Sequence, residues 1–263
     1  MRSEDAMVPE KKLEEFVRRM KAAAGTNLES VILYGSAVAG DFHPEFSNLN
    51  LFCVLRDSSF AALEALAPMA QWWEGEKQPP PLFMTRAELR CSSDIFTIEL
   101  LDMKQYHRVL EGEDVLKDLE VPLHPHGMQV EYELREKLLL LRQGLVLVSG
   151  DRKRMGDLLV RSVSSFVTLF RHALMVLGEA APVGKRATLE AVAGRLKLDT
   201  SAIEQVLDVR EKKANPKKLD VNDLFARYLG VVEQVANAVD TARGADGSAD
   251  SQRHPHSNTQ ESL

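Results

Sequence analysis

The chain has 263 residues, 44% of them hydrophobic and 27% charged, and its 33 basic and 39 acidic residues give a formal net charge of −6. This composition predicts a globular chain with a sizeable core, long enough for one large domain or two ordinary ones. It argues against a general nucleic-acid binder, which needs a surplus of Lys and Arg, although it leaves room for a local basic patch. Two cysteines, Cys53 and Cys91, are too few for a disulfide framework or a four-ligand zinc site.

The first twelve residues are polar and acidic and contain no apolar segment, so we predict neither a secretory signal nor a transit peptide. No stretch reaches the ~18 apolar residues of a membrane span, because Arg142 and Gln143 interrupt the longest candidate. We therefore expect a cytoplasmic protein without a membrane partner.

Residues 1–122 mix helical and strand patterns. Apolar residues at helical spacing before Gly25 predict an opening helix, and short β-branched runs bounded by Gly, Pro and Asn predict strands. The expected elements, in chain order, are a helix over 9–24, strands over 31–34 and 49–55, a helix over 58–73, and strands over 82–84 and 95–101. This order predicts an α/β (α+β) domain in which helices pack on a mixed sheet of four or five strands.

The pattern becomes helical throughout after Pro125. Two long apolar stripes, one through Leu134 and Leu138 and one through Phe166 and Phe170, predict helices that bury each other. The expected helices cover 129–148, 151–177, 185–195, 201–211 and 221–242. We therefore predict an all-helical bundle domain over 128–242, followed by a polar, disordered tail over 243–263.

One motif carries a resemblance to a known family. Tyr34-Gly35-Ser36 ends a predicted strand, eleven residues follow, and Asn48-Leu49-Asn50-Leu51 begins the next strand. This ordered set resembles the signature of the DNA polymerase β-like nucleotidyltransferase superfamily. The resemblance covers about residues 28–103, and the helical second half looks like the domain that antibiotic nucleotidyltransferases append.

The resemblance implies a nucleotide site at the end of the first strand. In this family the glycine and serine, here Gly35 and Ser36, hold the triphosphate of a nucleotide. Two acids at alternate positions of the next strand share one face and, with a third acid from a neighbouring strand, hold two Mg²⁺ ions. The positions of the two acids are Asn48 and Asn50 here, and Glu99 matches the third acid.

The sequence departs from the family pattern at these two asparagines and at Ala39, where an arginine often follows the serine. A carboxylate about 4 Å from a unit charge in a partly shielded site contributes on the order of 4 kcal/mol. Since every ~1.4 kcal/mol is tenfold in affinity, two amides should weaken metal binding by several powers of ten. Mg²⁺, which selects carboxylate and phosphate oxygens, is the ion most affected.

Other interpretations of the motif stay open. The asparagines could simply begin a strand and hydrogen-bond a turn, with no ancestral site. Alternatively, other acids could replace the missing pair, although Asp102 falls on the opposite strand face from Glu99 if residues 95–101 form a strand. The candidates are Asp41, Glu45, Asp94 and Asp102.

Two functional hypotheses follow. The preferred one is a nucleotidyltransferase-fold protein with an impaired two-metal site, a pseudoenzyme that binds a nucleoside triphosphate or a protein partner and has either no cofactor or a weakly held Mg²⁺ at Glu99. The alternative is an active Mg²⁺-dependent transferase acting on a small molecule, a protein or RNA. A nucleic-acid partner is not favoured, because of the net charge.

Four further groups are candidates for binding, although a structural or solvated role is the favoured interpretation of each. A basic segment from Arg210 to Lys218 and the run Arg152-Lys153-Arg154, which opens a predicted helix against its dipole, are hints of anion binding. His107 and Arg108 are placed on a short helix bordering the cleft. Trp72-Trp73 could stack on a base, but a helix end packed on the sheet is preferred.

Overall fold

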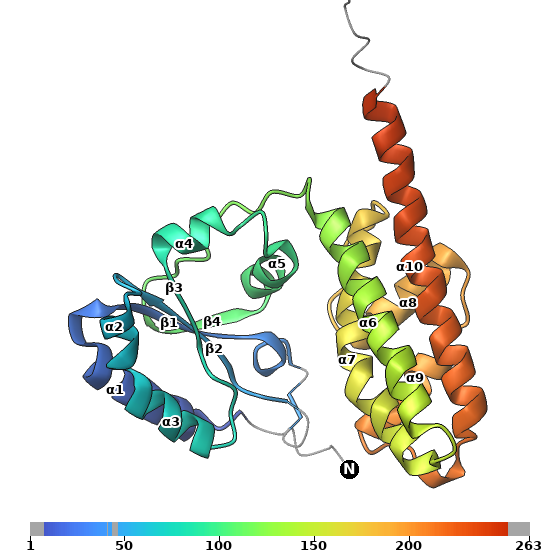
Figure 1. Ribbon diagram of the computed structural model, residues 1–263, viewed down its shortest axis with the longest axis horizontal. Coiled ribbons are helices and arrows are strands. Elements are labelled where there is room, and N and C mark those ends of the chain that lie inside the picture. The colour runs from blue at the N-terminus through green and yellow to red at the C-terminus, as the bar shows by residue number, and fades with distance from the viewer. Residues whose placement is uncertain (1–7, 41, 44–46, 252–263) are drawn as a thin grey trace, which may run out of the picture. The chain divides into compact units, whose positions relative to one another are not determined.

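The computed structural model describes residues 8–40, 42–43 and 47–251, and of residues 245–251 it describes the backbone alone. The chain divides into two compact units, with the boundary between Pro125 and His126 (Figure 1). This division lies between the residues 122 and 128 at which we expected one domain to end and the next to begin. The expected tail beyond residue 251 lies outside the described residues.

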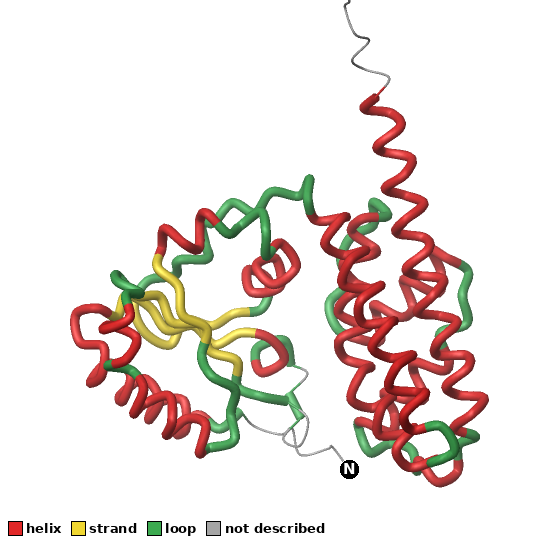
Figure 2. Tube along the Cα trace, in the orientation of Figure 1, coloured by secondary structure: helices red, strands yellow, loops and turns green. Residues whose placement is uncertain are grey.

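A four-stranded mixed sheet forms the centre of the first unit (Figure 2). Its order is β3-β2-β1-β4, in which β1 is antiparallel to both neighbours and β2 is parallel to β3. The strands are β1 (Leu28–Tyr34), β2 (Asn50–Leu55), β3 (Leu82–Thr85) and β4 (His107–Gly112). The mixed α+β architecture that we expected is therefore the observed one.

Helices cover both faces of this sheet. On one face α1 (Glu10–Ala24) and α3 (Ala67–Gly75) pack on alternate residues of β1 and β2, with Phe16 and Trp73 fully buried. On the other face α4 (Arg86–Cys91) and α5 (Thr97–Gln105) pack on the intervening residues. Since side chains alternate along a strand, β1 and β2 are apolar on both faces, which explains their uninterrupted hydrophobic runs.

The predicted strand over 95–101 is wrong, because Thr97–Gln105 is helix α5. A short apolar run does not distinguish a strand from a buried helix, and here the spacing decides. Thr97, Leu100 and Met103, at intervals of three, face the core. The fourth strand of the sheet is instead β4, which our sequence reading missed.

Two smaller predictions are also corrected. His107 and Arg108 begin strand β4 and do not lie on a helix. The single helix expected over 58–73 is two helices, α2 (Phe60–Glu64) and α3, because the chain turns at Leu66 and restarts with Pro68 in the first turn of α3.

The second unit is a helical bundle. Three long helices, over residues 126–148, 152–176 and 221–251, contact one another. Two shorter helices pack against the helix over 152–176. The helices are α6 (His126–Val148), α7 (Arg152–Val176), α8 (Lys185–Leu196), α9 (Ser201–Arg210) and α10 (Val221–Ser251). The backbone of α10 continues nine residues beyond the expected end at residue 242.

Helix α7 is long and apolar enough to cross a membrane by length and composition alone. Ten of its side chains are buried within the bundle, including Val163, Phe166 and Phe170. Burial of this kind is typical of the core helix of a folded domain, which passes the same test.

Candidate functional site

The predicted phosphate-binding residues lie on a tight turn at the end of β1. Gly35, with a φ of +79°, opens a 3₁₀ turn over Gly35–Ala37, and its carbonyl accepts hydrogen bonds from the amides of Val38 and Ala39 at 2.9 and 3.0 Å. The Gly35 amide donates to the carbonyl of Tyr106 at 3.2 Å, so it is already used within the fold. The next amides of the turn lack intrahelical acceptors, as at any helix start, and are the ones that an anion would meet.

Asn50 lies directly against this turn. It is the register partner of Tyr34 across β1 and β2, and a Cβ built on Gly35 would come within 3.1 Å of its Nδ2 atom. Asn48 is exposed just before β2, and Leu49 between the two asparagines is buried on the face covered by α1 and α3. Because Phe52 and Val54 face α5, the alternation along β2 turns Asn50 toward that same side, whereas Asn48 precedes the strand.

Glu99 reaches the same end of β1, but from helix α5. Its side chain is exposed, and its negative charge acts on Tyr34: burial, and secondly the Glu99 charge, raises the pKa of the Tyr34 hydroxyl. Asp102, expected on the opposite strand face from Glu99, is instead three residues along the same helix. Residues at this spacing are surface neighbours on a helix, so the expected separation is wrong.

The remaining acids proposed as substitutes for the missing carboxylates are Asp41, Glu45 and Asp94. Asp41 and Glu45 lie outside the described residues, and Asp94 is exposed in the turn before α5. Among the residues that the structure does describe, no group of three His, Cys, Asp or Glu side chains is arranged to hold a metal ion.

The histidine and arginine expected beside the cleft both contact carboxylates. His107 Nε2 lies 3.1 Å from Asp114, and both terminal nitrogens of Arg108 bond Glu10 at 3.0 and 2.9 Å. The two tryptophans pack as structural residues: Trp73 is fully buried, and the Arg19 guanidinium lies over the ring of Trp72 at 4.4 Å.

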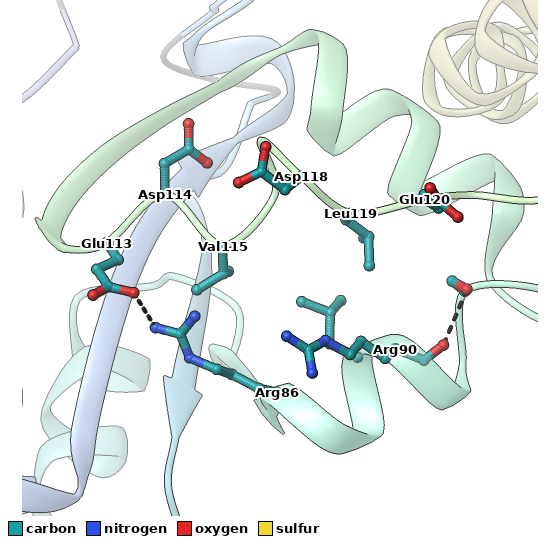
Figure 3. Close-up of a pocket in the computed structure, with 10 residues that line it drawn as sticks. Arg86, Arg90, Glu113, Asp114, Val115, Asp118, Leu119 and Glu120 are labelled. Carbon is teal, nitrogen blue, oxygen red and sulfur yellow. Dashed lines mark hydrogen bonds and ion pairs between the residues drawn. The ribbon is translucent and has the colours of Figure 1, made fainter.

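A pocket that our sequence reading missed lies at the opposite end of the sheet from Gly35. Its volume is about 490 Å³, and it lies between α4 and the loop after β4. In Figure 3, Arg86 and Arg90 extend from α4 beneath Val115 and Leu119. Arg86 links α4 to the loop after β4, because its Nη2 atom donates to Glu113 at 2.6 Å. Its Nε atom donates to Glu29 of β1, also at 2.6 Å. No sequence motif marks this pocket, since it forms only when the loop folds back over α4.

Comparison with known families finds a match for the first unit. A model of the nucleotidyltransferase domain matches residues 10–107, from the start of α1 to the first residue of β4. The first unit therefore has a nucleotidyltransferase-like fold. The matched region contains Gly35, Ser36, both asparagines and Glu99.

The solved structures extend the likeness to both units. The chain is similar to spectinomycin adenyltransferase AAD(9) from Enterococcus faecialis, whose crystal structure contains ATP and spectinomycin. The TM-score is 0.55 with 15% sequence identity, over 88% of this chain and 99% of that one. At this identity the likeness concerns the fold, a nucleotidyltransferase-like domain followed by helices. No curated protein matches the sequence.

Proposed function

We propose that this chain binds a nucleoside triphosphate at the Gly35–Ala37 turn of its nucleotidyltransferase domain and that its two-metal centre is impaired. The observation that carries the proposal is the position of the Asn50 amide, which a Cβ added to Gly35 would approach to 3.1 Å. At the end of β1, where the family resemblance requires a carboxylate, a neutral side chain lies against the turn that would hold the phosphates.

The donors available to Mg²⁺ do not fit a pair of these ions. Mg²⁺ is held in proteins by carboxylates together with phosphate oxygens, and the three positions that match the family triad hold two amides and the carboxylate of Glu99. An amide oxygen can coordinate a cation but does not neutralise it. At about 4 Å and a shielded-surface dielectric, each missing carboxylate costs on the order of 4 kcal/mol per unit of cation charge. We therefore derive no catalytic step through Mg²⁺.

Calorimetry with and without Mg²⁺ tests this proposal. The unmodified protein should bind ATP, CTP, GTP or UTP with an affinity that Mg²⁺ changes little. The variant carrying Asn48→Asp and Asn50→Asp should gain Mg²⁺-dependent binding. The control carries Asn222→Asp and Asn237→Asp on exposed positions of α10, which add the same charge away from the turn. Strong Mg²⁺ dependence in the unmodified protein, or an equal gain in the control, would overturn the proposal.

The alternative is an active Mg²⁺-dependent nucleotidyltransferase acting on a small molecule, a protein or RNA. One observation supports it: the charge of Glu99 contributes to the raised pKa of Tyr34 at the end of β1, so a carboxylate lies near the proposed site. Transfer of label from an α-labelled nucleoside triphosphate to any acceptor, abolished by Glu99→Gln, would establish this alternative. The same label remaining unincorporated while nucleotide binding persists supports the impaired centre.

A further inference from the structure

The two units of the chain differ in charge. Residues 1–125 contain 13 basic and 21 acidic residues, for a net charge of −8, whereas residues 126–263 contain 20 basic and 18 acidic residues, for a net charge of +2. The overall negative charge of the chain therefore conceals a helical unit that is slightly basic. We therefore expect a local positive surface on the helical unit and not on the first unit.

The fold joins two basic runs that are more than sixty residues apart in the sequence. Arg152, the first residue of α7, donates from Nη2 to the carbonyl of Leu219 at 2.9 Å, and Leu219 follows directly after Lys217 and Lys218. We call the resulting surface the basic end. It consists of five exposed side chains, Arg152, Lys153, Arg154, Lys217 and Lys218.

The cations of the basic end differ from many other cations of the bundle because they form no ion pairs with acidic side chains of the described residues. Elsewhere in the helical unit many basic side chains form ion pairs with acids. These are Arg135, Lys137, Arg142, Arg186, Arg195, Arg227 and Arg243. Lys153, Arg154, Lys217 and Lys218 form no ion pair with an acid in the described part of the chain, although Asp151 and Asp220 cap the two helices that begin at this end. Their charges are directed to solvent.

A helix dipole adds to this positive potential. The first turn of α7 contains no acid, and Asp151, its N-cap, accepts the amides of Lys153 and Arg154 at 3.1 and 3.0 Å. Helix α10 begins at Val221, beside the same Arg152–Leu219 contact, but Asp220 caps it and Asp223 lies in its first turn, so only the α7 N-terminus adds to the positive potential. Each cation in a first turn is disfavoured by the dipole of its helix, and an anionic partner would compensate this.

The spacing of the five cations favours a chain of phosphates over a single one. Consecutive residues of a helix point about 100° apart, so Arg152, Lys153 and Arg154 fan out around the end of α7 and do not converge on one point. We propose that the basic end binds the phosphate backbone of a nucleic acid. The net charge of −6 does not prevent this, because repulsion from distant charges is screened beyond about 8–10 Å at physiological salt.

The test is binding of fluorescently labelled duplex DNA and single-stranded RNA of mixed sequence, followed by anisotropy at rising KCl concentration. If all five cations contact phosphates, the slope of log K against log salt should be about −4 to −5 for the duplex and −3 to −4 for the single strand. Duplex affinity should then fall by roughly 10²- to 10³-fold between about 50 and 200 mM salt.

Charge-reversal variants locate the surface. Lys217→Glu with Lys218→Glu should weaken binding at least about tenfold and make the slope less steep by about two. Lys153→Gln with Arg154→Gln should give a similar change in slope without reversing charge. The control is Lys11→Glu with Lys117→Glu, which changes net charge equally at exposed positions of the first unit and should have little effect.

Three results would overturn the proposal. The first is no binding of either nucleic acid at about 50 mM salt. The second is an equal loss of binding in the control and the charge-reversal variant. The third is binding of vesicles containing anionic lipid, or of a poly-glutamate peptide, at least as tightly as nucleic acid. Circular dichroism of each variant establishes that the bundle is folded before binding is compared.

Discussion

Replacing Gly35 by alanine tests the geometry on which the nucleotide site depends. At a φ of +79° an alanine occupies backbone space that L-residues avoid, at a cost of about 1–2 kcal/mol. The added Cβ would also lie 3.1 Å from Asn50 Nδ2, which forces the amide to move by a few tenths of an ångström. We expect the first unit to lose about 1–3 kcal/mol of stability in total.

Tryptophan fluorescence can follow this loss in one unit alone. Both tryptophans of the chain, Trp72 and Trp73, lie in the first unit, so their emission reports its unfolding in urea. The matched control is Gly75→Ala at the end of α3, where φ is ordinary and the added Cβ meets nothing within 4 Å. This control should be neutral or slightly stabilising, because alanine is the better helix former.

A double-mutant cycle separates strain from contact. With Asn50→Ala in place, the cost of Gly35→Ala should fall by about 0.5 kcal/mol, because the crowding is removed while the strained φ remains. The reasoning is refuted if Gly35→Ala costs no more than Gly75→Ala. If the cost is present but unchanged by Asn50→Ala, the amide does not lie against the turn.

Three further substitutions test the packing around the site and the bundle. Gly112→Ala should destabilise the first unit by at least about 3 kcal/mol in urea unfolding, because its φ is +77° and the added Cβ would lie 1.9 Å from the backbone oxygen of Glu29. Trp73→Phe should change stability, measured by circular dichroism, by less than about 1.5 kcal/mol, because the lost contacts are offset by removing a buried indole N–H that has no acceptor among the described residues. Tyr228→Phe should cost about 1 kcal/mol in thermal unfolding, because it removes the 3.0 Å hydrogen bond to Ser162.

Strands β1 and β2 were predictable because their sequence has a single consistent interpretation. The apolar run at 31–34 ends at Gly35, and the apolar run at 51–55 begins shortly after Asn48. These two runs lie in the buried parts of β1 and β2, whereas the start of β1, which includes Glu29 and Ser30, was not predicted. The five helices of the second unit were predictable for a different reason: their apolar stripes persist over several turns, and only a helix brings such residues to one face.

The residue types at the start of α5 favour a strand, so the sequence did not reveal that this segment is a helix. Phe96, Thr97 and Ile98 have high strand propensity, but Leu100 and Met103 continue the apolar pattern at a spacing of three. Tertiary packing on β1 and β2 selects the helix. Glu99 therefore lies on a helix and not on the predicted strand, and its role as a metal ligand stays a prediction.

Residues paired across long sequence distances were beyond prediction for a physical reason. The hydrogen bond from Arg152 to the carbonyl of Leu219 depends on how separate elements pack, and so do the two hydrogen bonds of Arg86 to Glu29 and Glu113. Periodicity and capping report only on neighbours within a few residues. Both the basic end and the pocket beside α4 become visible only when the chain is folded.

The two asparagines also have a consequence for stability that can be measured. Carboxylates at these two positions would repel each other when no cation lies between them, and this repulsion would destabilise the fold. The amides remove this repulsion while keeping nearly the same shape, so the fold no longer needs a metal to be stable. The variant with Asn48→Asp and Asn50→Asp should therefore melt lower than the unmodified protein in EDTA and regain stability in Mg²⁺, by about 1.4 kcal/mol at ten times its Kd. Mg²⁺ should leave the unmodified protein's melting temperature unchanged. If Mg²⁺ raises both melting temperatures equally, the cation binds elsewhere, and the electrostatic account of the asparagines is wrong.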